Sequence, residues 1–271
     1  MPRRTRLDAE LVRRGLARSR EHAGQLIADG RVSIAGAVAR KPATAVGIDA
    51  AVQVRTTDEP DWASRGAHKL LGALAVFEPR GLTVAGRRCL DAGASTGGFT
   101  DVLLRRGAAH VVAADVGYGQ LAWRLRTDDR VTVLDRTNVR ALGPDATGGP
   151  VDLVVADLSF ISLRLVLPAL VACAAADAEL LPMVKPQFEV GRQRLGSGGV
   201  VRDPADRADA VLDVVRCARE LGWGLHGVVA SPLPGPSGNV EYFVWLRAGA
   251  RAEHDEDAAE LVRRAVEEGP A

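Results

Sequence analysis

Residues Asp91 to Thr100, which read DAGASTGGFT, combine a carboxylate with three closely spaced glycines. A short apolar stretch at 88–90 precedes this turn, and an apolar helical run follows it. A strand, a glycine-rich turn and a helix in this order let a ligand approach bare backbone at the helix N-terminus. The stretch therefore predicts a ligand-binding site.

The glycine spacing and the nearby carboxylates narrow the choice of ligand. The turn has neither the G-x-G-x-x-G spacing of a dinucleotide site nor the G-x-x-x-x-G-K-[ST] pattern of a P-loop. Asp115 ends the next predicted strand, 24 residues after Asp91, near the interval at which a carboxylate can take ribose hydroxyls. This arrangement favours a ligand with an ammonium group and a ribose, such as S-adenosylmethionine. The alternative is a glycine turn with two aspartates that only cap helices.

Four further polar residues, Lys69, Asp157, Lys185 and Glu241, suggest proton transfer, although each alone is more typical of a solvated or capping group. Lys185 stands among apolar neighbours in MVKPQFE. A lysine accepts a proton only if burial or a neighbouring cation lowers its pKa. Lys69 would be that cation, and the two carboxylates would orient the ammonium groups.

The elements that must position these residues alternate between strand and helix. The expected strands are 88–90, 111–114, 131–134, 151–156, 180–184, 228–230 and 241–246, and the expected helices are 64–77, 161–176, 204–221 and one starting near Phe99. Such alternation predicts an α/β protein with a mostly parallel, Rossmann-like doubly wound sheet, whose ligands bind beyond the carboxyl ends of the strands. The expected cofactor residues are Asp91, Gly93, Ala94, Ser95, Thr96, Gly97, Gly98, Asp115, Asn138 and Asp157.

Charge is distributed unevenly along the chain. The net charge is +1, but residues 1–41 contain ten Arg or Lys against four Asp or Glu, which indicates a polyanionic partner engaged at one end. The three cysteines lack C-x-x-C spacing and the histidines lack ligand spacing, so no metal site is expected. We find no signal peptide and no apolar run of 18 residues, and therefore expect a cytoplasmic protein without a membrane span.

The N-terminal segment predicts a small α+β module. Asp8 and Ser19 are expected to cap two short helices, and alternating strands follow at 31–34 and 51–54. The patterns L-x-x-x-L-V-x-R-G-L-A-x-S-R and G-x-V-x-I-x-G resemble the S4 RNA-binding fold; the alternative is a module with a merely solvated basic face. The resemblance implies that arginines contact phosphates, namely Arg4, Arg6, Arg13, Arg14, Arg18, Arg20 and Arg31.

A second resemblance covers nearly all of the chain up to about Arg247. With the glycine turn, the stretches SRGAHKL, DVGYGQLAW, DLSFISL, KPQFEVG and SPLPGPSGNVEYF resemble the FtsJ/RrmJ class of ribose 2′-O-methyltransferases. With the S4-like segment in front, the chain resembles the TlyA family, also called hemolysin A proteins. The resemblance implies S-adenosylmethionine-dependent methylation of cytidine 2′-hydroxyls in 16S and 23S ribosomal RNA, within 30S and 50S subunits, and a link to capreomycin susceptibility.

The resemblance also implies boundaries and roles. We expect an S4-like domain at 1–59, a linker at 60–64, a methyltransferase domain at 65–250 and an acidic tail helix at 251–271, in a monomer. Lys69, Asp157, Lys185 and Glu241 would be catalytic, with Lys185 taking or steering the proton. The implied RNA contacts beyond the S4-like segment are Arg65, Phe160, which would stack on a flipped nucleotide or else pack in the core, and Ser237, which would touch substrate or else only form a turn.

Three alternatives remain open. One is an RNA-binding ribosome assembly factor without catalysis. Another is a membrane-active hemolysin, which the absence of a span or a cationic amphipathic helix with aromatic anchors disfavours. The third is a base methyltransferase, although the chain has Asp157-Leu158-Ser159-Phe160 where such enzymes often have an Asn-Pro-Pro-Tyr loop.

Overall fold

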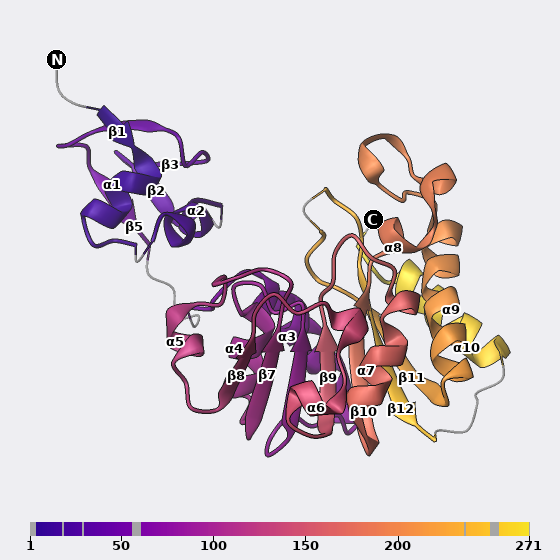
Figure 1. The fold of residues 1–271 in the computed structure, drawn as a ribbon. Helices are drawn as coiled ribbons and strands as arrows, with labels where there is room; N and C mark the ends of the chain where they lie inside the picture. The colour runs from indigo at the N-terminus through magenta and orange to yellow at the C-terminus, as the bar shows by residue number, and fades with distance from the viewer. Residues whose placement is uncertain are drawn as a thin grey trace. The chain divides into compact units, whose positions relative to one another are not determined.

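The computed structural model describes residues 4–17, 19–28, 30–55, 61–235, 237–249 and 255–270. The chain divides into two compact units, Met1–Asp61 and Trp62–Ala271 (Figure 1).

The first unit is a small α+β module. Its helices are α1 (Leu7–Arg13) and α2 (Arg20–Ala28), and its strands are β1 (Arg4–Arg6), β2 (Val32–Ile34), β3 (Ala37–Val38), β4 (Ala45–Gly47) and β5 (Val52–Val54). Strand β2 pairs antiparallel with both β3 and β5, and β1 pairs antiparallel with β4. A core built around Leu7, Leu11 and Ile27 holds the helices on these strands.

One of the two predicted helix caps is confirmed and the other is wrong. The Ser19 hydroxyl accepts a hydrogen bond from the backbone N–H of His22 (3.1 Å), as an N-cap should. Asp8 lies inside α1, because β1 remains paired to β4 as far as Arg6 and the helix starts directly after it at Leu7. The Asp8 carboxylate instead pairs with arginines, as described below.

The second unit contains a seven-stranded sheet in the order β11-β12-β10-β9-β6-β7-β8. The strands are β6 (Arg88–Ala92), β7 (His110–Ala114), β8 (Val131–Leu134), β9 (Val151–Ala156), β10 (Ala174–Val184), β11 (Trp223–Ala230) and β12 (Tyr242–Ala248). Strands β10, β9, β6, β7 and β8 are parallel, and β12 runs antiparallel to both its neighbours. The mostly parallel α/β sheet is therefore confirmed, with an antiparallel pair at one edge.

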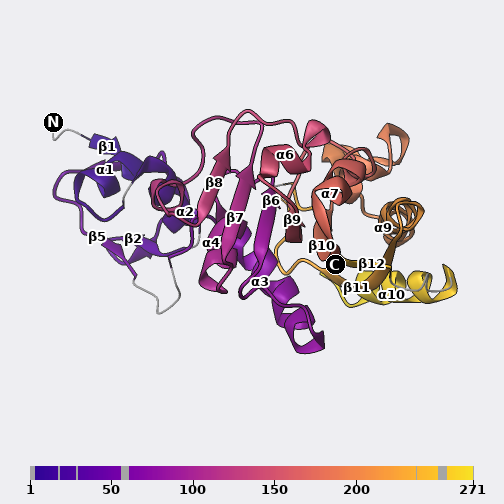
Figure 2. The same ribbon diagram turned by 60° about the horizontal axis from the view of Figure 1, so that its bottom comes forward.

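Helices cover both faces of this sheet, as the doubly wound prediction requires (Figure 1, Figure 2). Adjacent strand residues such as Cys89 and Leu90 belong to different cores because side chains alternate across a strand. One core includes α3 (Gly66–Phe77) and α4 (Gly98–Arg105); the other includes α7 (Leu167–Cys173), α9 (Pro204–Glu220) and α10 (Asp255–Glu267). Short helices α5 (Trp123–Arg126), α6 (Pro144–Thr147) and α8 (Pro186–Glu189) lie in the connections.

The helix expected at 161–176 is much shorter in the structure. A 3₁₀ turn, η3 (Leu163–Leu165), precedes α7, and β10 already begins at Ala174. Ala174 pairs with Val151, and a register shift then separates this pair from the regular ladder that starts at Glu179. The small residues of this stretch thus extend the strand, and Pro168 lies in the first turn of α7, where a missing N–H costs nothing.

Candidate active site

The glycine turn between β6 and α4 is tightly packed. Gly93 has φ +89°, and a Cβ there would lie 2.6 Å from the Asp157 carbonyl oxygen. Gly97, with φ +96°, is the N-cap of α4. The backbone N–H of Ser95 donates to Asp115 Oδ2 (2.9 Å), so the carboxylate at the end of β7 holds the turn. Only glycine fits positions 93 and 97 without a clash, which leaves the backbone close to the strand ends.

Asp91 is completely buried at the end of β6. Its Oδ2 accepts a hydrogen bond from the Thr100 hydroxyl (2.6 Å), whereas Oδ1 has no hydrogen-bond partner among the described residues. Burial raises the pKa of the Asp91 carboxyl to about 7. A buried carboxyl with an unused oxygen fits the ammonium group of S-adenosylmethionine, which would both pair with it and donate to it.

Asp115 and Asn138 also lie at strand ends, but in this structure they bond backbone groups. Asp115 Oδ1 accepts from the Gly117 N–H (2.7 Å), and Asn138 Oδ1 accepts from the Arg140 N–H (3.1 Å) at the start of η2 (Val139–Ala141). Each side-chain oxygen keeps a second lone pair for a ligand hydroxyl. Ribose binding by these two residues therefore stays a prediction.

The four residues predicted to be catalytic form one continuous chain of alternating charges. Lys69 on α3 pairs with Glu241, just before β12, through Nζ and Oε2 at 2.5 Å. Lys185, just after β10, pairs with Asp157, just after β9, through Nζ and Oδ1 at 2.6 Å. Glu241 Oε1 lies 4.0 Å from Lys185 Nζ and so joins the two pairs. Three of the four are buried, and such charges are stable only when paired.

Two contacts at this chain were not predicted from the sequence. Ser159 Oγ accepts a hydrogen bond from Lys185 Nζ (2.9 Å), and the only available signal was its position two residues after Asp157. Gly235 lies against Glu241, because a Cβ at residue 235 would be 2.6 Å from Oε1. Gly235 thus lies directly against the carboxylate, and Lys185 Nζ has Ser159 Oγ, Asp157 Oδ1 and Glu241 Oε1 around it near the strand ends.

Phe160 does not pack in the core. Its side chain is 92% exposed, which rules out the alternative of core packing. Its backbone has φ +64°, an uncommon conformation for a bulky residue, and its ring centroid lies 5.3 Å from that of Phe188. Ser237 is exposed. Stacking on a nucleotide by Phe160 and substrate contact by Ser237 remain predictions.

The arginines of the first unit are organised by two buried carboxylates. Asp8 pairs with Arg6 and Arg20, each at 3.0 Å. Glu10 pairs with Arg13 (2.6 Å) and Arg14 (2.7 Å). Hydrogen bonds from these guanidinium groups lower the pKa of each carboxyl to about 2. Four guanidinium groups share two negative charges, so the cluster keeps a net positive charge.

The remaining predicted RNA-binding arginines differ in their surroundings. Arg14 also donates to the carbonyls of Ala50 and Ile48 (2.7 Å each), which ties it into the unit, and Arg31 Nε donates to the Arg55 carbonyl (3.1 Å). Arg4 on β1 and Arg65, at the start of α3, are exposed. Arg18 lies outside the described residues.

In the parts of the chain that the structure describes, no group of three or more His, Cys, Asp or Glu side chains is arranged to hold a metal ion. None of the helices found there is long and apolar enough to cross a bilayer.

Known proteins resemble this chain along its whole length. It is 66% identical over 271 residues to a Mycobacterium tuberculosis protein named 16S/23S rRNA (cytidine-2′-O)-methyltransferase TlyA, with 100% of both chains covered. It is 32% identical over 238 residues to Hemolysin A of Brachyspira hyodysenteriae, covering 88% of this chain and 97% of that one. The solved structure of a hemolysin-like protein from Streptococcus thermophilus matches with a TM-score of 0.75 and 36% identity, covering 99% of this chain and 97% of the other.

Family models match both units. The model described as FtsJ-like methyltransferase matches residues 62–248, and the one described as S4 domain matches residues 5–52. The resemblances expected from the sequence are thereby confirmed. The chain belongs to the FtsJ-like methyltransferase family and has an S4 domain in front of its methyltransferase fold.

Proposed function

We propose that this protein transfers a methyl group from S-adenosylmethionine to the 2′-hydroxyl of cytidines in 16S and 23S ribosomal RNA. The observation that supports this most directly is the buried Lys69–Glu241–Lys185–Asp157 chain beside the glycine turn. The name of the full-length relative from Mycobacterium tuberculosis supports the choice of cytidine and of both RNAs.

The residues divide into cofactor-holding and proton-handling groups. The turn at 93–98 and Asp91, Asp115, Asn138 and Asp157 would hold S-adenosylmethionine, with Asp91 facing its ammonium group. When bound, this cofactor supplies an activated electrophilic methyl group. The protein must then only align the 2′-oxygen and remove one proton.

Lys185 is the group that takes or steers the 2′-hydroxyl proton at Nζ. Ser159 Oγ accepts a hydrogen bond from one of its N–H groups (2.9 Å), and the Asp157 carboxylate pairs with the ammonium group at 2.6 Å. Lys69 places a second buried ammonium group on the other oxygen of the Glu241 carboxylate, so Glu241 joins the two lysines. Asp157 bridges this chain to the cofactor turn, because its carbonyl lies against Gly93.

RNA binding is assigned to residues on both units. Arg4, Arg6, Arg14, Arg18 and Arg20 of the S4 domain would contact phosphates, and Arg65, Phe160 and Ser237 would contact RNA from the methyltransferase unit. The exposed Phe160 ring suits stacking on an extruded nucleotide. We propose 30S and 50S subunits as substrates, a monomeric protein, and action in the cytoplasm, where these subunits are found.

The test is radiolabelled methyl transfer to purified 30S and 50S subunits, with the modified positions mapped by reverse transcription at low nucleotide concentration. Discrete stops at cytidines are expected for the wild-type protein. Lys185→Ala should lower the rate by roughly 10²- to 10⁴-fold, the usual contribution of proton transfer. Lys185→Arg should lower the rate to a similar extent, because an arginine keeps the charge but does not release its proton.

Cofactor binding by calorimetry controls for folding in both Lys185 variants and should be retained. If a folded, cofactor-binding wild-type protein transfers no methyl group to either subunit, the substrate assignment is wrong. An RNA-binding assembly factor would then become the leading interpretation.

A further inference from the structure

Two segments that follow neighbouring parallel strands are linked by several side chains. Residues 157–163 follow β9, and residues 185–189 follow β10. The first link is Lys185, whose Nζ contacts both Asp157 and Ser159. Both segments are part of the candidate active site, so whatever fixes one against the other also fixes the site.

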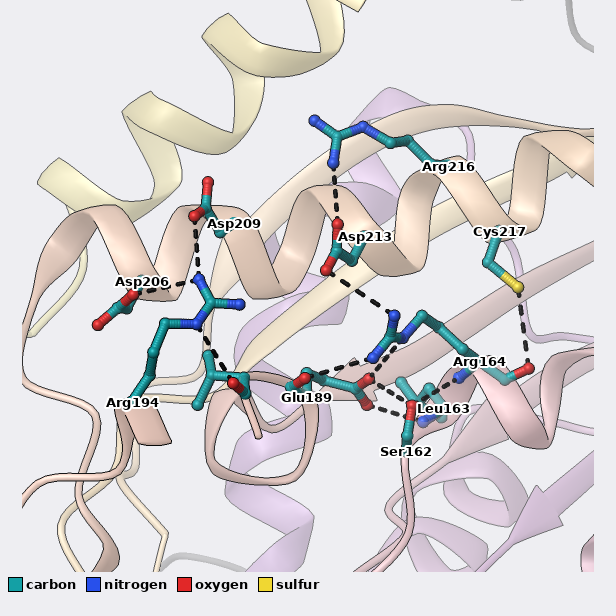
Figure 3. A network of polar contacts seen from close by, with 11 residues as sticks. Ser162, Leu163, Arg164, Glu189, Arg194, Asp206, Asp209, Asp213, Arg216 and Cys217 are labelled. Atoms are coloured by element: carbon teal, nitrogen blue, oxygen red, sulfur yellow. Dashed lines mark hydrogen bonds and ion pairs between the residues drawn. The ribbon is translucent and has the colours of Figure 1, made fainter. Parts of the chain in front are cut away.

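Glu189, the last residue of α8, makes a second link that the proposed reaction does not use. Its carboxylate accepts from the Ser162 hydroxyl at 2.5 Å and from the Leu163 N–H at 2.7 Å. Arg164 Nε lies 3.4 Å from the same carboxylate (Figure 3). The Glu189 side chain is only 1% exposed, so these donors replace water. Charge-assisted hydrogen bonds of this kind are among the stronger ones in proteins.

Phe160 lies between the two links. Its side chain is exposed, and its backbone has a left-handed conformation. A loop without supporting contacts would not keep a bulky residue in this strained conformation. Its ring contacts Phe188, the neighbour of Glu189 on α8. The contacts therefore run in parallel along the two segments: Lys185 to 157 and 159, Phe188 to 160, and Glu189 to 162 and 163.

The long helix α9 anchors this arrangement from outside. Arg164 Nη2 donates to the Glu189 carbonyl (3.3 Å), and its Nη1 lies 3.9 Å from Asp213 on α9. Arg194 Nε donates to the Val190 carbonyl (3.2 Å), and the same guanidinium pairs with Asp206 and Asp209 of α9, as Figure 3 shows. The turn that contains Glu189 is thus held to a helix packed on the sheet.

We propose that Glu189 is a positioning residue for methyl transfer: it holds the 157–163 segment against α8, so that Phe160 and Lys185 meet the target nucleotide as one rigid unit. This inference rests on the proposed function. Glu189 acts through its neighbours, because its buried carboxylate is already used by three donors. It does not touch the substrate.

The variant that tests this is Glu189→Gln, which keeps the size but removes the charge and replaces one acceptor oxygen by an NH₂ group. We expect kcat for 30S methylation to fall roughly 10- to 100-fold, since small misplacements of reacting groups cost about that much. The KM for subunits and the affinity for S-adenosylmethionine should stay at wild-type values. Glu260→Gln makes the same change at an exposed carboxylate of α10 that pairs with Arg263 outside this network, and it is the control that should keep the wild-type kcat.

Hydrogen exchange of backbone amides in the full-length protein tests the contact between Glu189 and residues 162–163 independently of methyl transfer. The Leu163 amide and its neighbours at 158–163 should exchange faster in Glu189→Gln, while amides of β6 and β9 should not. The double variant Phe160→Ala/Glu189→Gln should lose less activity than the product of the two single losses, because both changes affect one unit.

Three results would overturn the inference: a wild-type kcat in Glu189→Gln, unchanged exchange at 158–163, or fully multiplicative losses in the double variant. Loss of cofactor affinity would also count against it, by showing a general structural role. Failure of the proposed function looks different, since the wild-type protein itself would then methylate neither subunit while exchange still reported on the Glu189 link.

Discussion

At the candidate site, the burial of a side chain decides its proposed role as much as its residue type does. Asp91 lies near the end of β6, opposite Ala113 of β7, and Asp115 directly follows β7. Asp91 is completely buried with one oxygen unused, whereas Asp115 is partly exposed and bonds two backbone N–H groups. We therefore propose that Asp91 meets the ammonium group and that Asp115 contacts hydroxyls.

The raised pKa of Asp91 predicts how cofactor affinity depends on pH. The carboxyl is mostly protonated below about 7 and ionised above it. Because an ammonium group pairs with the ionised form, affinity should rise as the pH goes from about 6 to about 7.5, before an α-amino group starts to lose its own proton near 8. Calorimetry in buffers of different ionisation enthalpy should show proton release on binding. Asp91→Asn should bind weakly at every pH; a pH-dependence retained in that variant would assign the titration to another group.

The same shift affects the stability of the ligand-free protein. The folded-state pKa of Asp91 lies above its ordinary value of 3.8, so the folded state holds this proton more tightly than the unfolded state. The contribution of Asp91 is therefore fully present below pH 3.8 and is lost as the pH rises through about 7. Bound cofactor should remove this loss by pairing with the ionised carboxyl.

Elements are positioned by packing that the local sequence does not show. The acidic C-terminal stretch was expected only as a tail helix, but in the structure α10 packs one side against α9 and β11. Its apolar residues Ala258, Val262 and Val266 are buried in the core on that face of the sheet. Figure 1 shows α10 lying beside α9. The helix therefore belongs to the methyltransferase unit.

This packing predicts a stability cost for a change in α10. Val262→Ala should lower the free energy of unfolding by about 2 kcal/mol, because it deletes two buried methyl groups and leaves a cavity. Urea unfolding followed by circular dichroism measures the change. Arg263→Ala, on the exposed side of the same helix, is the control and should cost far less. Equal losses in the two variants would mean that α10 is not held by its apolar side.

At the scale of the whole molecule, the two units have separate cores, and the proposed cofactor residues belong to the second unit alone. The core around Leu7, Leu11 and Ile27 supports the arginine cluster, and the two cores of the sheet support the cofactor turn and the lysine chain. Affinity for RNA and affinity for the cofactor should therefore respond to different substitutions.

We predict that Arg4→Ala and Asp91→Asn each weaken one affinity and leave the other unchanged. Arg4→Ala should weaken 30S binding and lower the slope of log K against log salt by about 0.7 to 0.9, the value for one lost phosphate contact. Arg4→Ala should leave the affinity for S-adenosylmethionine unchanged. Asp91→Asn should weaken the affinity for S-adenosylmethionine and leave 30S binding unchanged. Filter binding at several salt concentrations and calorimetry measure the two quantities. An Arg4→Ala protein with wild-type salt dependence would remove Arg4 from the RNA-binding surface.

Much of the methyltransferase fold was predictable because strands and turns are encoded locally. The strands at 131–134 and 151–156 have their predicted bounds, and the positive φ of Gly93 and Gly97 matches the turn read from the glycines. The length of β10 was not predictable. Its start at Ala174 depends on pairing with β9, which no local pattern reports.

The sequence by itself determined the order of strand, turn and helix, the carboxylates at successive strand ends, and the basic character of the first unit, because these follow from periodicity and composition. Only the tertiary structure decided which charges meet. Lys69 and Glu241 are 172 positions apart and pair because α3 and the segment before β12 converge on one edge of the sheet. Likewise, Phe160 is exposed and Glu189 is buried because of contacts between segments that follow different strands, and side-chain burial of that kind exists only once the sheet has formed.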